Sequence, residues 1–338
     1  MSVCVVRPGL LTSLQDLGRY GLQHLGIVPG GAMDPVAHRI ANALVDNPAA
    51  AATLECTVLG PDLIVGHDAL IALYGAAFDA RIDRLPLPLN RPVLVKAGST
   101  LKIGAAARGA RAYLAIAGGF EVAEVLGSRS TYIPAAFGGL EGRALKAGDR
   151  LPGITDLARI SIARFARIAA RNGRFAHSGF SSVRWHAPEL TLPYQGGLTL
   201  RAMEGRHFQQ FDAASREAFF DQIWRVSPDS NRMGYRLTGP RLTRTKPVEI
   251  LSEPTCLGTV QVPNDGIPIA LMADHQTTGG YPKIAEIASV DIPGLAQLAP
   301  GGSVRFVACS LEEAQAAHKV AQARVRTVVQ AIEWAYTI

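Results

Sequence analysis

The sequence predicts a mainly β protein with a few helices, built from two similar halves and ending in a long helix. Short runs of Val, Ile, Leu and Thr alternate with Gly, Pro and Asp turns through most of the chain, which is typical of short strands. From residue 311 onward the pattern changes to that of one long helix. The 338 residues suffice for two domains of ordinary size, each with its own core.

The first half, residues 1–153, combines strands with one helix. Asp34 can cap this helix, Pro35 fits its first turn, and apolar residues recur with helical spacing up to Leu44. We therefore interpret Asp34 as a cap rather than a catalyst. The strands expected here are residues 3–6, 53–59, 69–74, 93–96, 100–103 and 111–117.

Residues 154–192 are predicted to be a linker or surface insertion, because their composition shifts to Arg and then to Ser, His and Gly. The arginines could form an anion-binding or nucleic-acid-binding face, or the solvated side of a connecting helix. We favour the helix. The arginines concerned are Arg159, Arg164, Arg167, Arg171 and Arg174.

The second half, residues 193–310, resumes the strand pattern. A helix is expected at residues 213–224, with Phe219, Phe220 and Ile223 on its buried side. The final helix, residues 311–338, begins at a capping box in which Glu313 follows Ser310 by three positions. The strands expected here are residues 198–204, 248–251, 260–262, 267–273 and 303–309.

The two halves resemble each other in three pairs of segments. These are residues 53–55 and 250–253, 71–75 and 269–273, and 96–101 and 299–304. Strand and turn patterns also resemble one another without a common origin, so both interpretations stay open. If the repeat is real, the halves are related barrel-like domains, and a site at their junction is favoured.

Composition argues against nucleic-acid and membrane partners. The net charge of +6 comes almost wholly from arginine, without the basic clusters and interleaved aromatics of nucleic-acid binders. No apolar run approaches the roughly 20 residues of a membrane-spanning helix, and the first residues lack a signal-peptide pattern. The four cysteines are scattered, as in reduced cytoplasmic proteins. We expect a cytoplasmic protein.

Several common catalytic motifs do not occur in the sequence. There is no GxxxxGK[ST] phosphate loop, no Met-Lys-Met biotin-attachment site, no HExxH and no Gly-x-Ser-x-Gly elbow. The eight histidines are dispersed, so we expect no metal site in this chain. A mobile cofactor, a nucleotide or part of the chemistry is therefore expected from elsewhere.

Two polar segments in the first 34 residues are candidates for ligand binding. Asp16 and Arg19 lie three residues apart in a predicted loop. They can orient a substrate amide or form a salt bridge that shapes the turn, and the sequence favours neither interpretation. Residues 28–34 place two glycines before a helix, where exposed backbone N–H groups suit an anion.

Two arginine-centred segments can clamp a carboxylate or phosphate. Arg129 is flanked by hydroxyls, including Ser130, and by nearby glycines. Arg232 shares segment 230–237 with Tyr235 and a second arginine. One of the two arginines in that segment is expected to have only a structural partner.

Segment 273–283 carries the strongest catalytic pattern. An apolar strand delivers Asp274 to a polar turn that contains Gly279 and Gly280. Such a turn can supply oxyanion-binding N–H groups together with proton-transfer side chains. An Asx-type turn with a buried tyrosine is the alternative, and we favour function. We assign no role to His275.

Seven motifs in register carry a family resemblance. They are TSLQDLGR, GAMD with the helix ending ANALVDNP, RAYLAIAGGF, LGSRST, SNRMGYRL, QVPNDGIPI and DHQTTGGYPKIA. Together they resemble the biotin-dependent carboxyltransferase domain family, which includes allophanate hydrolase subunit 2, KipA and the C-type subunit of 5-oxoprolinase. The resemblance spans residues 5–150 and 195–308.

The resemblance implies two cyclophilin-like β-barrel subdomains, at residues 1–153 and 193–310, with an active cleft between them. It also implies the residues that line this cleft. They are Asp16, Arg19, Arg129, Ser130, Arg232, Tyr235, Asp274, Gln276, Thr277 and Tyr281. Within this set Asp274, Tyr281, Gln276 and Thr277 are the catalytic candidates, and the others bind substrate together with Gly279 and Gly280.

Two positions depart from the family pattern. His275 stands where relatives often have arginine, and Gly30 stands where a serine is usual, which removes one hydroxyl. Segment 154–190 is also longer than is typical of the family. None of these departures removes an expected site residue.

The resemblance implies three functions. The first is the C-type subunit of an ATP-dependent 5-oxoprolinase complex that opens 5-oxoproline to glutamate; its partners are a KipI-like B-type subunit and a LamB/YcsF-like A-type subunit. The second is transfer of CO₂ from carboxybiotin, supplied by another chain, to urea or a similar amide. The third is KipA-like, non-catalytic binding of a KipI-like kinase inhibitor. We favour the first.

Overall fold

The computed structural model describes residues 2–153, 155–171, 174–176, 179–191, 197–245 and 249–337. The chain forms two compact units. The first unit comprises Met1–Gly18, Asp34–Leu192 and Arg324–Ile338, and the second comprises Arg19–Met33 and Pro193–Ala323. The short segment Arg19–Met33 thus belongs to the second unit, although it lies within the predicted first half.

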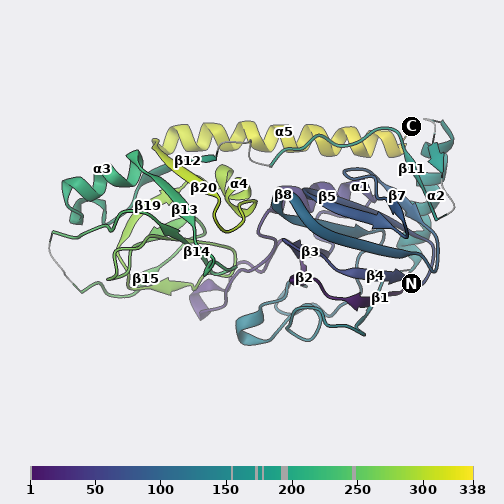
Figure 1. The fold of residues 1–338 in the computed structure, drawn as a ribbon, viewed down its shortest axis with the longest axis horizontal. Coiled ribbons are helices and arrows are strands. Elements are labelled where there is room, and N and C mark those ends of the chain that lie inside the picture. The colour runs from purple at the N-terminus through teal and green to yellow at the C-terminus, as the bar shows by residue number, and fades with distance from the viewer. Residues whose placement is uncertain are drawn as a thin grey trace. The chain divides into compact units, whose positions relative to one another are not determined.

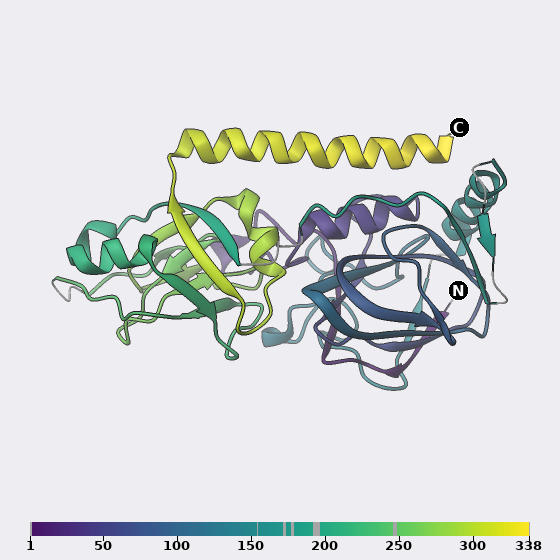
Figure 2. The same cartoon turned by 45° about the horizontal axis from the view of Figure 1, so that its top comes forward.

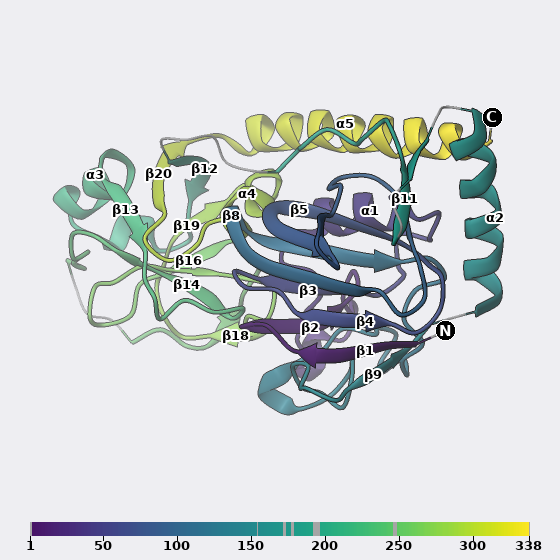
Figure 3. The ribbon, with the colours of Figure 1, turned by 45° about the vertical axis from the view of Figure 1, so that its right-hand side comes forward.

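The first unit is built on a sheet that contains eleven strands among its described residues. The long strands β5 (Ala69–Ile82) and β8 (Thr100–Ile116) pair antiparallel at its centre, with a register that shifts at Gly75. Figure 3 shows β1, β4 and β9 along one side of this sheet. The other strands are β1 (Ser2–Arg7), β2 (Leu11–Gln15), β3 (Thr53–Thr57), β4 (Asp62–Val65), β6 (Leu85–Pro86), β7 (Val93–Val95), β9 (Arg150–Pro152), β10 (Arg174–Ala176) and β11 (Phe180–Val183).

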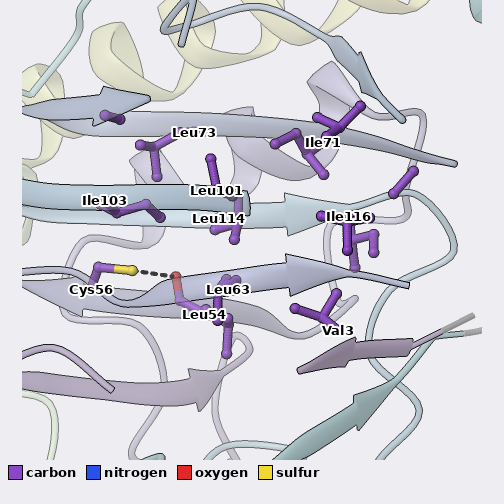
Figure 4. Close-up of a cluster of buried hydrophobic side chains, with 14 of the residues drawn as sticks. Val3, Leu54, Cys56, Leu63, Ile71, Leu73, Leu101, Ile103, Leu114 and Ile116 are labelled. Carbon is purple, nitrogen blue, oxygen red and sulfur yellow. Dashed lines mark hydrogen bonds between the residues drawn. The ribbon is translucent and has the colours of Figure 1, made fainter. Parts of the chain in front are cut away.

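Aliphatic side chains from the inner face of this sheet form the core of the first unit. Leu54, Ile71, Leu114 and Ile116 are almost completely buried, and Figure 4 shows them directed toward one another from different strands. Cys56 also points into this core, with its thiol 3.9 Å from the Leu54 carbonyl oxygen. Alternating inward and outward residues on the strands therefore give this unit a hydrophobic interior.

Among the described residues, two α-helices lie wholly within the first unit. Helix α1 (Pro35–Leu44) begins where predicted, and the carboxylate of Asp34 accepts a hydrogen bond from the Ala37 N–H at 2.9 Å. The cap prediction for Asp34 is therefore confirmed. Helix α2 (Thr155–Arg171) forms within the predicted insertion, and β10 and β11 follow it. Strand β11 pairs with β7, so this insertion extends the sheet.

The second unit contains a closed barrel of seven strands among the described residues. Strands β12 and β20 run parallel and lie side by side in Figure 1, whereas the other neighbours pair antiparallel. The barrel strands are β12 (Leu198–Glu204), β13 (Ile223–Val226), β14 (Gly234–Thr238), β16 (Thr259–Gln261), β17 (Ile269–Leu271), β19 (Lys283–Ile287) and β20 (Ser303–Ala308). Two short strands, β15 (Glu253–Pro254) and β18 (Thr278–Gly279), form a separate ladder.

Helix α3 (Ala213–Asp221) is shorter than predicted, because Gln222 is already extended. Phe219 is buried as expected, but Ile223 lies in β13 and is 62% exposed, so its predicted burial is wrong. Trp224 fills the core instead. The strand expected at residues 248–251 is also wrong where the structure describes it, since residues 249–251 form no strand, and Val248 lies outside the described residues.

The mainly β class with a few helices is confirmed. Closure into a barrel is confirmed for one half, since the second unit holds the only closed barrel among the described residues. The remaining helices are α4 (Ile292–Ala296) and α5 (Leu311–Thr337), and Figure 2 shows α5 as one continuous helix. Ser310 and Glu313 form the predicted capping box at its start.

In the first unit, the last turns of α5 pack through Val325, Ile332 and Tyr336. The Tyr336 hydroxyl donates a hydrogen bond to the Leu44 carbonyl at 2.7 Å. Within the described residues, none of the helices has the length and apolar character needed to span a membrane.

Candidate active site

Asp16 lies at the centre of a buried polar cluster in the first unit, directly after β2. Its Oδ1 accepts hydrogen bonds from the hydroxyls of Ser128 at 2.6 Å and Ser130 at 2.5 Å. The backbone N–H groups of Arg129 and Gly18 donate to the carboxylate at 2.6 and 2.8 Å. The cluster therefore joins the end of β2 to the loop at residues 128–130, and Asp16 organises that loop.

These donors determine the ionisation of Asp16. Burial opposes the charged form, but the hydrogen bonds from Ser128, Ser130, Arg129 and Gly18 outweigh it and hold the pKa of Asp16 below its usual value. The carboxylate is thus charged at neutral pH without a cationic partner among these four donors. Neutral donors in a fixed arrangement stabilise it.

The Arg129 side chain makes a contact of its own, apart from the backbone hydrogen bond to Asp16. It is 33% exposed and lies 3.7 Å from the Glu124 carboxylate, a long ion pair. It also lines a cavity of about 180 Å³ whose other walls are mainly small and apolar, including Ala52, Gly119 and Phe120. This arginine is therefore accessible to a small anion.

A second buried polar network in the first unit was not anticipated from the sequence. The Tyr113 hydroxyl donates to Glu55 Oε2 at 2.8 Å and accepts from the Asp34 N–H at 2.7 Å. Arg111 lies 3.7 Å from Glu55 and is 5% exposed. Strand pairing sets Glu55 opposite Tyr113, and no local sequence pattern reports such cross-strand partners.

His38 lies in α1 near this network. Its Nε2 donates to the Ala49 carbonyl at 3.0 Å, and its Nδ1 is 2.9 Å from the Thr53 hydroxyl. Burial lowers the pKa of His38 to about 4, although the carboxylates of Asp16 and Glu55 act in the opposite direction. The imidazole is therefore neutral at physiological pH.

Asp274 and Arg232 form a buried ion pair in the second unit. Arg232 Nε and Nη2 donate to the two carboxylate oxygens at 2.8 and 3.0 Å, and the two side chains are 5% and 2% exposed. Nη2 also donates to the Gly31 carbonyl at 2.6 Å. The sequence motifs at residues 28–34, 230–237 and 273–283 therefore meet at this pair.

Arg19 and Gly30 belong to the same region of the second unit. The Arg19 N–H donates to the Pro29 carbonyl at 2.8 Å, which closes the segment between them into a loop. A methyl group at Gly30 would lie 3.4 Å from Arg19 Nη1 and 3.6 Å from Asp274 Oδ1. Gly30 has a φ of +64°, so glycine suits this turn and leaves the space beside both charged groups open.

The polar turn after Asp274 is held by side-chain amides. Gln276 Nε2 donates to Gln261 Oε1 at 3.2 Å, and the Thr255 hydroxyl donates to the Gln276 carbonyl. Gln261 Nε2 is buried and has no hydrogen-bond partner among the described residues. A side chain at Gly279 would come within 2.8 Å of that nitrogen, so the Gln261 amide would have to shift to accommodate it.

His275 is fixed in this turn. Its Nδ1 donates to the Gln276 carbonyl at 2.7 Å, and burial lowers its pKa. The neighbouring Thr277 carbonyl accepts a hydrogen bond from the Thr255 N–H at 3.0 Å. Both residues therefore hold the turn against the segment that follows β15.

Lys283 and Glu253 also support the turn, and the sequence pattern did not single them out. Lys283 Nζ lies 3.1 Å from Glu253 Oε1 and donates to the Pro254 carbonyl at 2.5 Å. Strand pairing sets Glu253 opposite Gly279. The signal in the sequence was Lys283 itself, since it directly precedes an apolar strand pattern, and a lysine that is buried there needs a partner.

Tyr281 and Gly280 line a larger cavity of about 750 Å³ within the second unit. The Tyr281 side chain is accessible, since the residue is 47% exposed. Arg241 and Arg244 line the same cavity. Tyr235, in contrast, is 3% exposed and belongs to the hydrophobic core of the barrel.

The structure therefore gathers the predicted residues in two groups, one in each unit. The first contains Asp16, Ser130 and Arg129, and the second contains Arg19, Arg232, Asp274 and the turn at residues 276–281. Within the part of the chain that is described, no group of three or more His, Cys, Asp or Glu side chains could hold a metal ion. Arginines, amides and glycine turns suit a protein that acts on carboxylates and amides.

The particular family follows from comparison with known proteins. Residues 25–308 match the family described as carboxyltransferase domain, subdomain A and B, and the chain belongs to this family. It is 42% identical to the C-type subunit of 5-oxoprolinase from Escherichia coli over 310 residues, which cover 92% of each chain. It is 36% identical to the Haemophilus influenzae protein of the same name, with 89% of each chain covered.

A solved structure supports the same assignment. The urea amidolyase of K. lactis matches with a TM-score of 0.85 and 29% sequence identity. The match covers 97% of this chain but 20% of the urea amidolyase chain. The chain therefore corresponds to one region of that larger enzyme.

Proposed function

We propose that this chain is the C-type subunit of an ATP-dependent 5-oxoprolinase complex, which opens the lactam of 5-oxoproline to give glutamate. The supporting observation is the 42% identity to the E. coli protein over nearly the full length of both chains. We further propose two partners, a KipI-like B-type subunit and a LamB/YcsF-like A-type subunit, and a cytoplasmic location. The four free cysteines are consistent with a reducing compartment.

The proposed chemistry requires activation of a stable amide before water attacks it. A lactam carbonyl is a poor electrophile, so ATP hydrolysis must be coupled to activation, for example by phosphorylation of the lactam oxygen. Residues of this chain then hold the substrate carboxylate, stabilise the developing oxyanion and move a proton.

Arg129 is our candidate for the substrate carboxylate. Two guanidinium nitrogens of Arg232 are engaged by Asp274, whereas the Arg129 side chain is one-third exposed and lines a small apolar cavity. A cavity of about 180 Å³ suits a single ring with one carboxylate. Arg232 is then assigned to positioning, because its Nη2 also donates to the Gly31 carbonyl and holds that loop.

Tyr281 is our candidate for proton transfer. Asp274 is 1% exposed and engaged on both carboxylate oxygens by Arg232, which leaves it poorly placed to reach a substrate. The Tyr281 side chain is accessible and lines a cavity. We propose that Gly279 and Gly280 stabilise the oxyanion beside it, with Gln276 and Thr277 shaping the turn.

We also propose that both units have the cyclophilin-like barrel fold of the family. The closed barrel of the second unit supports this for that unit.

The test is co-expression with the neighbouring genes, followed by an assay for ATP-dependent release of glutamate from 5-oxoproline. We expect turnover only when every component of the complex is present. Tyr281→Phe and Arg129→Met are each expected to reduce turnover at least tenfold. A reconstituted complex that leaves 5-oxoproline intact would contradict the proposal.

A second candidate is transfer of CO₂ from carboxybiotin to urea or a similar amide. The observation in its favour is the structural match to urea amidolyase over 97% of this chain. Neighbouring genes for a biotin carboxylase and a biotin carrier would favour this candidate. The same purified complex would then carboxylate urea in the presence of the carrier and leave 5-oxoproline unchanged.

A further inference from the structure

Tyr281 lies in a short segment of the second unit whose two ends are fixed. We call this segment, residues 279–283, the Tyr281 arch. At one end, Gly279 pairs with Glu253 in the β15–β18 ladder. At the other end, Lys283 begins β19, which is a strand of the barrel. Tyr281 is exposed between these ends, so its position depends on what holds them.

The Lys283 side chain links the second end of the arch back to the first. It is buried, and its Nζ lies 3.1 Å from Glu253 Oε1 and donates to the Pro254 carbonyl at 2.5 Å. Both partners belong to β15, the strand that pairs with Gly279. The other carboxylate oxygen of Glu253 lies 3.1 Å from Arg206 Nη1. One buried cation therefore closes the arch into a ring.

His207 clamps the main chain of Lys283 with two hydrogen bonds. The His207 N–H donates to the Lys283 carbonyl at 3.0 Å, and the Lys283 N–H donates to His207 Nδ1 at 3.2 Å. A methyl group at Gly205 would lie 2.6 Å from the Lys283 carbonyl oxygen, so glycine allows this close approach. Because a backbone N–H can only donate, Nδ1 must be unprotonated, and the clamp is complete only while His207 is neutral.

The groups around His207 determine when it is neutral. Burial lowers the pKa of His207, and the Glu253 carboxylate, 3.8 Å from Nδ1, acts in the opposite direction. Three nearby cations lower the pKa further, and they are Lys283, Arg206 and Arg244. The ring is therefore neutral at physiological pH. A protonated ring would have no acceptor for the Lys283 N–H, so acid opens one half of the clamp.

We propose that Lys283 and His207 are positioning residues for Tyr281, and that they fix the Tyr281 arch so that the tyrosine hydroxyl is held in one place for proton transfer. This inference rests on the proposed function, which gives Tyr281 that role. It deepens the proposed function, because protonation of His207 then regulates the site. Acid releases the arch and lowers turnover, whereas the binding of substrate, assigned to Arg129, is retained.

The first test measures kcat and KM in the complete complex. Lys283→Met is expected to reduce kcat for 5-oxoproline at least tenfold, because a small displacement of Tyr281 is costly, and to leave the KM unchanged. Lys319→Met is the matched control, since Lys319 is an exposed lysine of α5. An unchanged kcat in Lys283→Met, or an equal fall in the control, would overturn the proposal.

A pair of substitutions at His207 tests the need for a neutral acceptor. His207→Asn keeps an acceptor where Nδ1 lies and takes up no proton, so kcat at pH 7.5 is expected to stay near the wild-type value. The fall in wild-type kcat below pH 6.5 should be largely removed in this variant. His207→Leu removes the acceptor and is expected to reduce kcat about tenfold at every pH. The same acid profile in wild type and His207→Asn would overturn the role of His207.

Hydrogen exchange in the isolated full chain separates this inference from the proposed function. Lys283→Met and His207→Leu are each expected to speed exchange of the amides at residues 279 and 283 about tenfold, with β12 and β20 still protected because the barrel stays folded. This result would support the fixing of the arch even if the complex leaves 5-oxoproline intact. Turnover of 5-oxoproline by wild type, with exchange unchanged in both variants, would retain the proposed function and overturn the inference.

Discussion

Asp16 in the first unit and Asp274 in the second are both buried, at 6% and 1% exposure, but different partners stabilise their charges. Asp16 is surrounded by two hydroxyls and two backbone N–H groups. Asp274 receives a guanidinium in a bidentate ion pair. Several neutral donors together stabilise the Asp16 carboxylate, whereas one guanidinium is the main partner of the Asp274 carboxylate.

This difference predicts how each site tolerates change. Removal of one of several neutral donors leaves the Asp16 carboxylate with three. Removal of the paired guanidinium leaves Asp274 as a buried charge without that compensation, which is far more costly. The first site should therefore weaken gradually, and the second should fail with one substitution.

The largest effect is expected for Arg232→Met. Breaking a buried ion pair from one side costs about 3–5 kcal/mol of the free energy of unfolding. Denaturant unfolding monitored by tryptophan fluorescence measures this, since Trp224, one of the three tryptophans, lies in the core of the same unit. The double variant with Asp274→Leu should recover much of the loss. If Arg232→Met alone were as stable as wild type, the two sites would not differ in their tolerance to substitution.

A somewhat smaller effect is expected from pH. His38 is neutral in the folded protein with a pKa of about 4, whereas the unfolded chain takes up a proton near pH 6.5. The unfolded state therefore binds more protons between these values, and stability falls as pH falls from about 6.5 to 4, by roughly 3 kcal/mol. His38→Gln should flatten this slope when the free energy of unfolding is measured against pH.

Below about pH 4, the further fall in the free energy of unfolding reports on Asp16. Its folded pKa is lowered, so its stabilising contribution is present above its unfolded pKa and is lost as pH falls through the folded value. The two residues of the first unit thus act in successive pH ranges. An unchanged slope in His38→Gln between pH 6.5 and 4 would contradict the assignment of this range to His38.

The smallest effect is expected for Ser128→Ala. This variant loses one hydrogen bond to a charged acceptor, which is worth about 1.5–3 kcal/mol, and the remaining donors compensate in part. The pKa of Asp16 should rise toward its usual value, so the variant should be more sensitive to acid than wild type. Thermal unfolding at pH 4 and pH 7 tests this. A loss of stability as large as that of Arg232→Met would show that the stabilisation of the Asp16 carboxylate is not shared among several donors.

The sequence predicted local features well because their causes are local. The Asp34 cap and the box of Ser310 and Glu313 depend on residues three positions apart, and both formed as expected. Ile223 was placed wrongly because a helical spacing continued past Asp221, where the backbone becomes extended and a strand begins. Apolar spacing over a few residues does not distinguish a helix end from a strand start.

The candidate site was predicted as a set of motifs, and their partners were not. The sequence indicated Arg232 and Asp274 separately, but only strand pairing brings residues 42 positions apart into one ion pair. The pairing of Lys283 with Glu253 and of Tyr113 with Glu55 could not be predicted for the same reason. Long-range partners depend on register, which a single sequence reports weakly.

The order of synthesis has a consequence for the first unit. Its compact body includes Arg324–Ile338, and Tyr336 reaches the end of α1 through its hydrogen bond to Leu44. In the sequence these residues follow the whole second barrel, so the ribosome makes them after it. The first unit, whose first strands are translated before the second barrel, is therefore completed only after that barrel, and a nascent chain that stalls before Arg324 would hold a finished second barrel and an incomplete first unit.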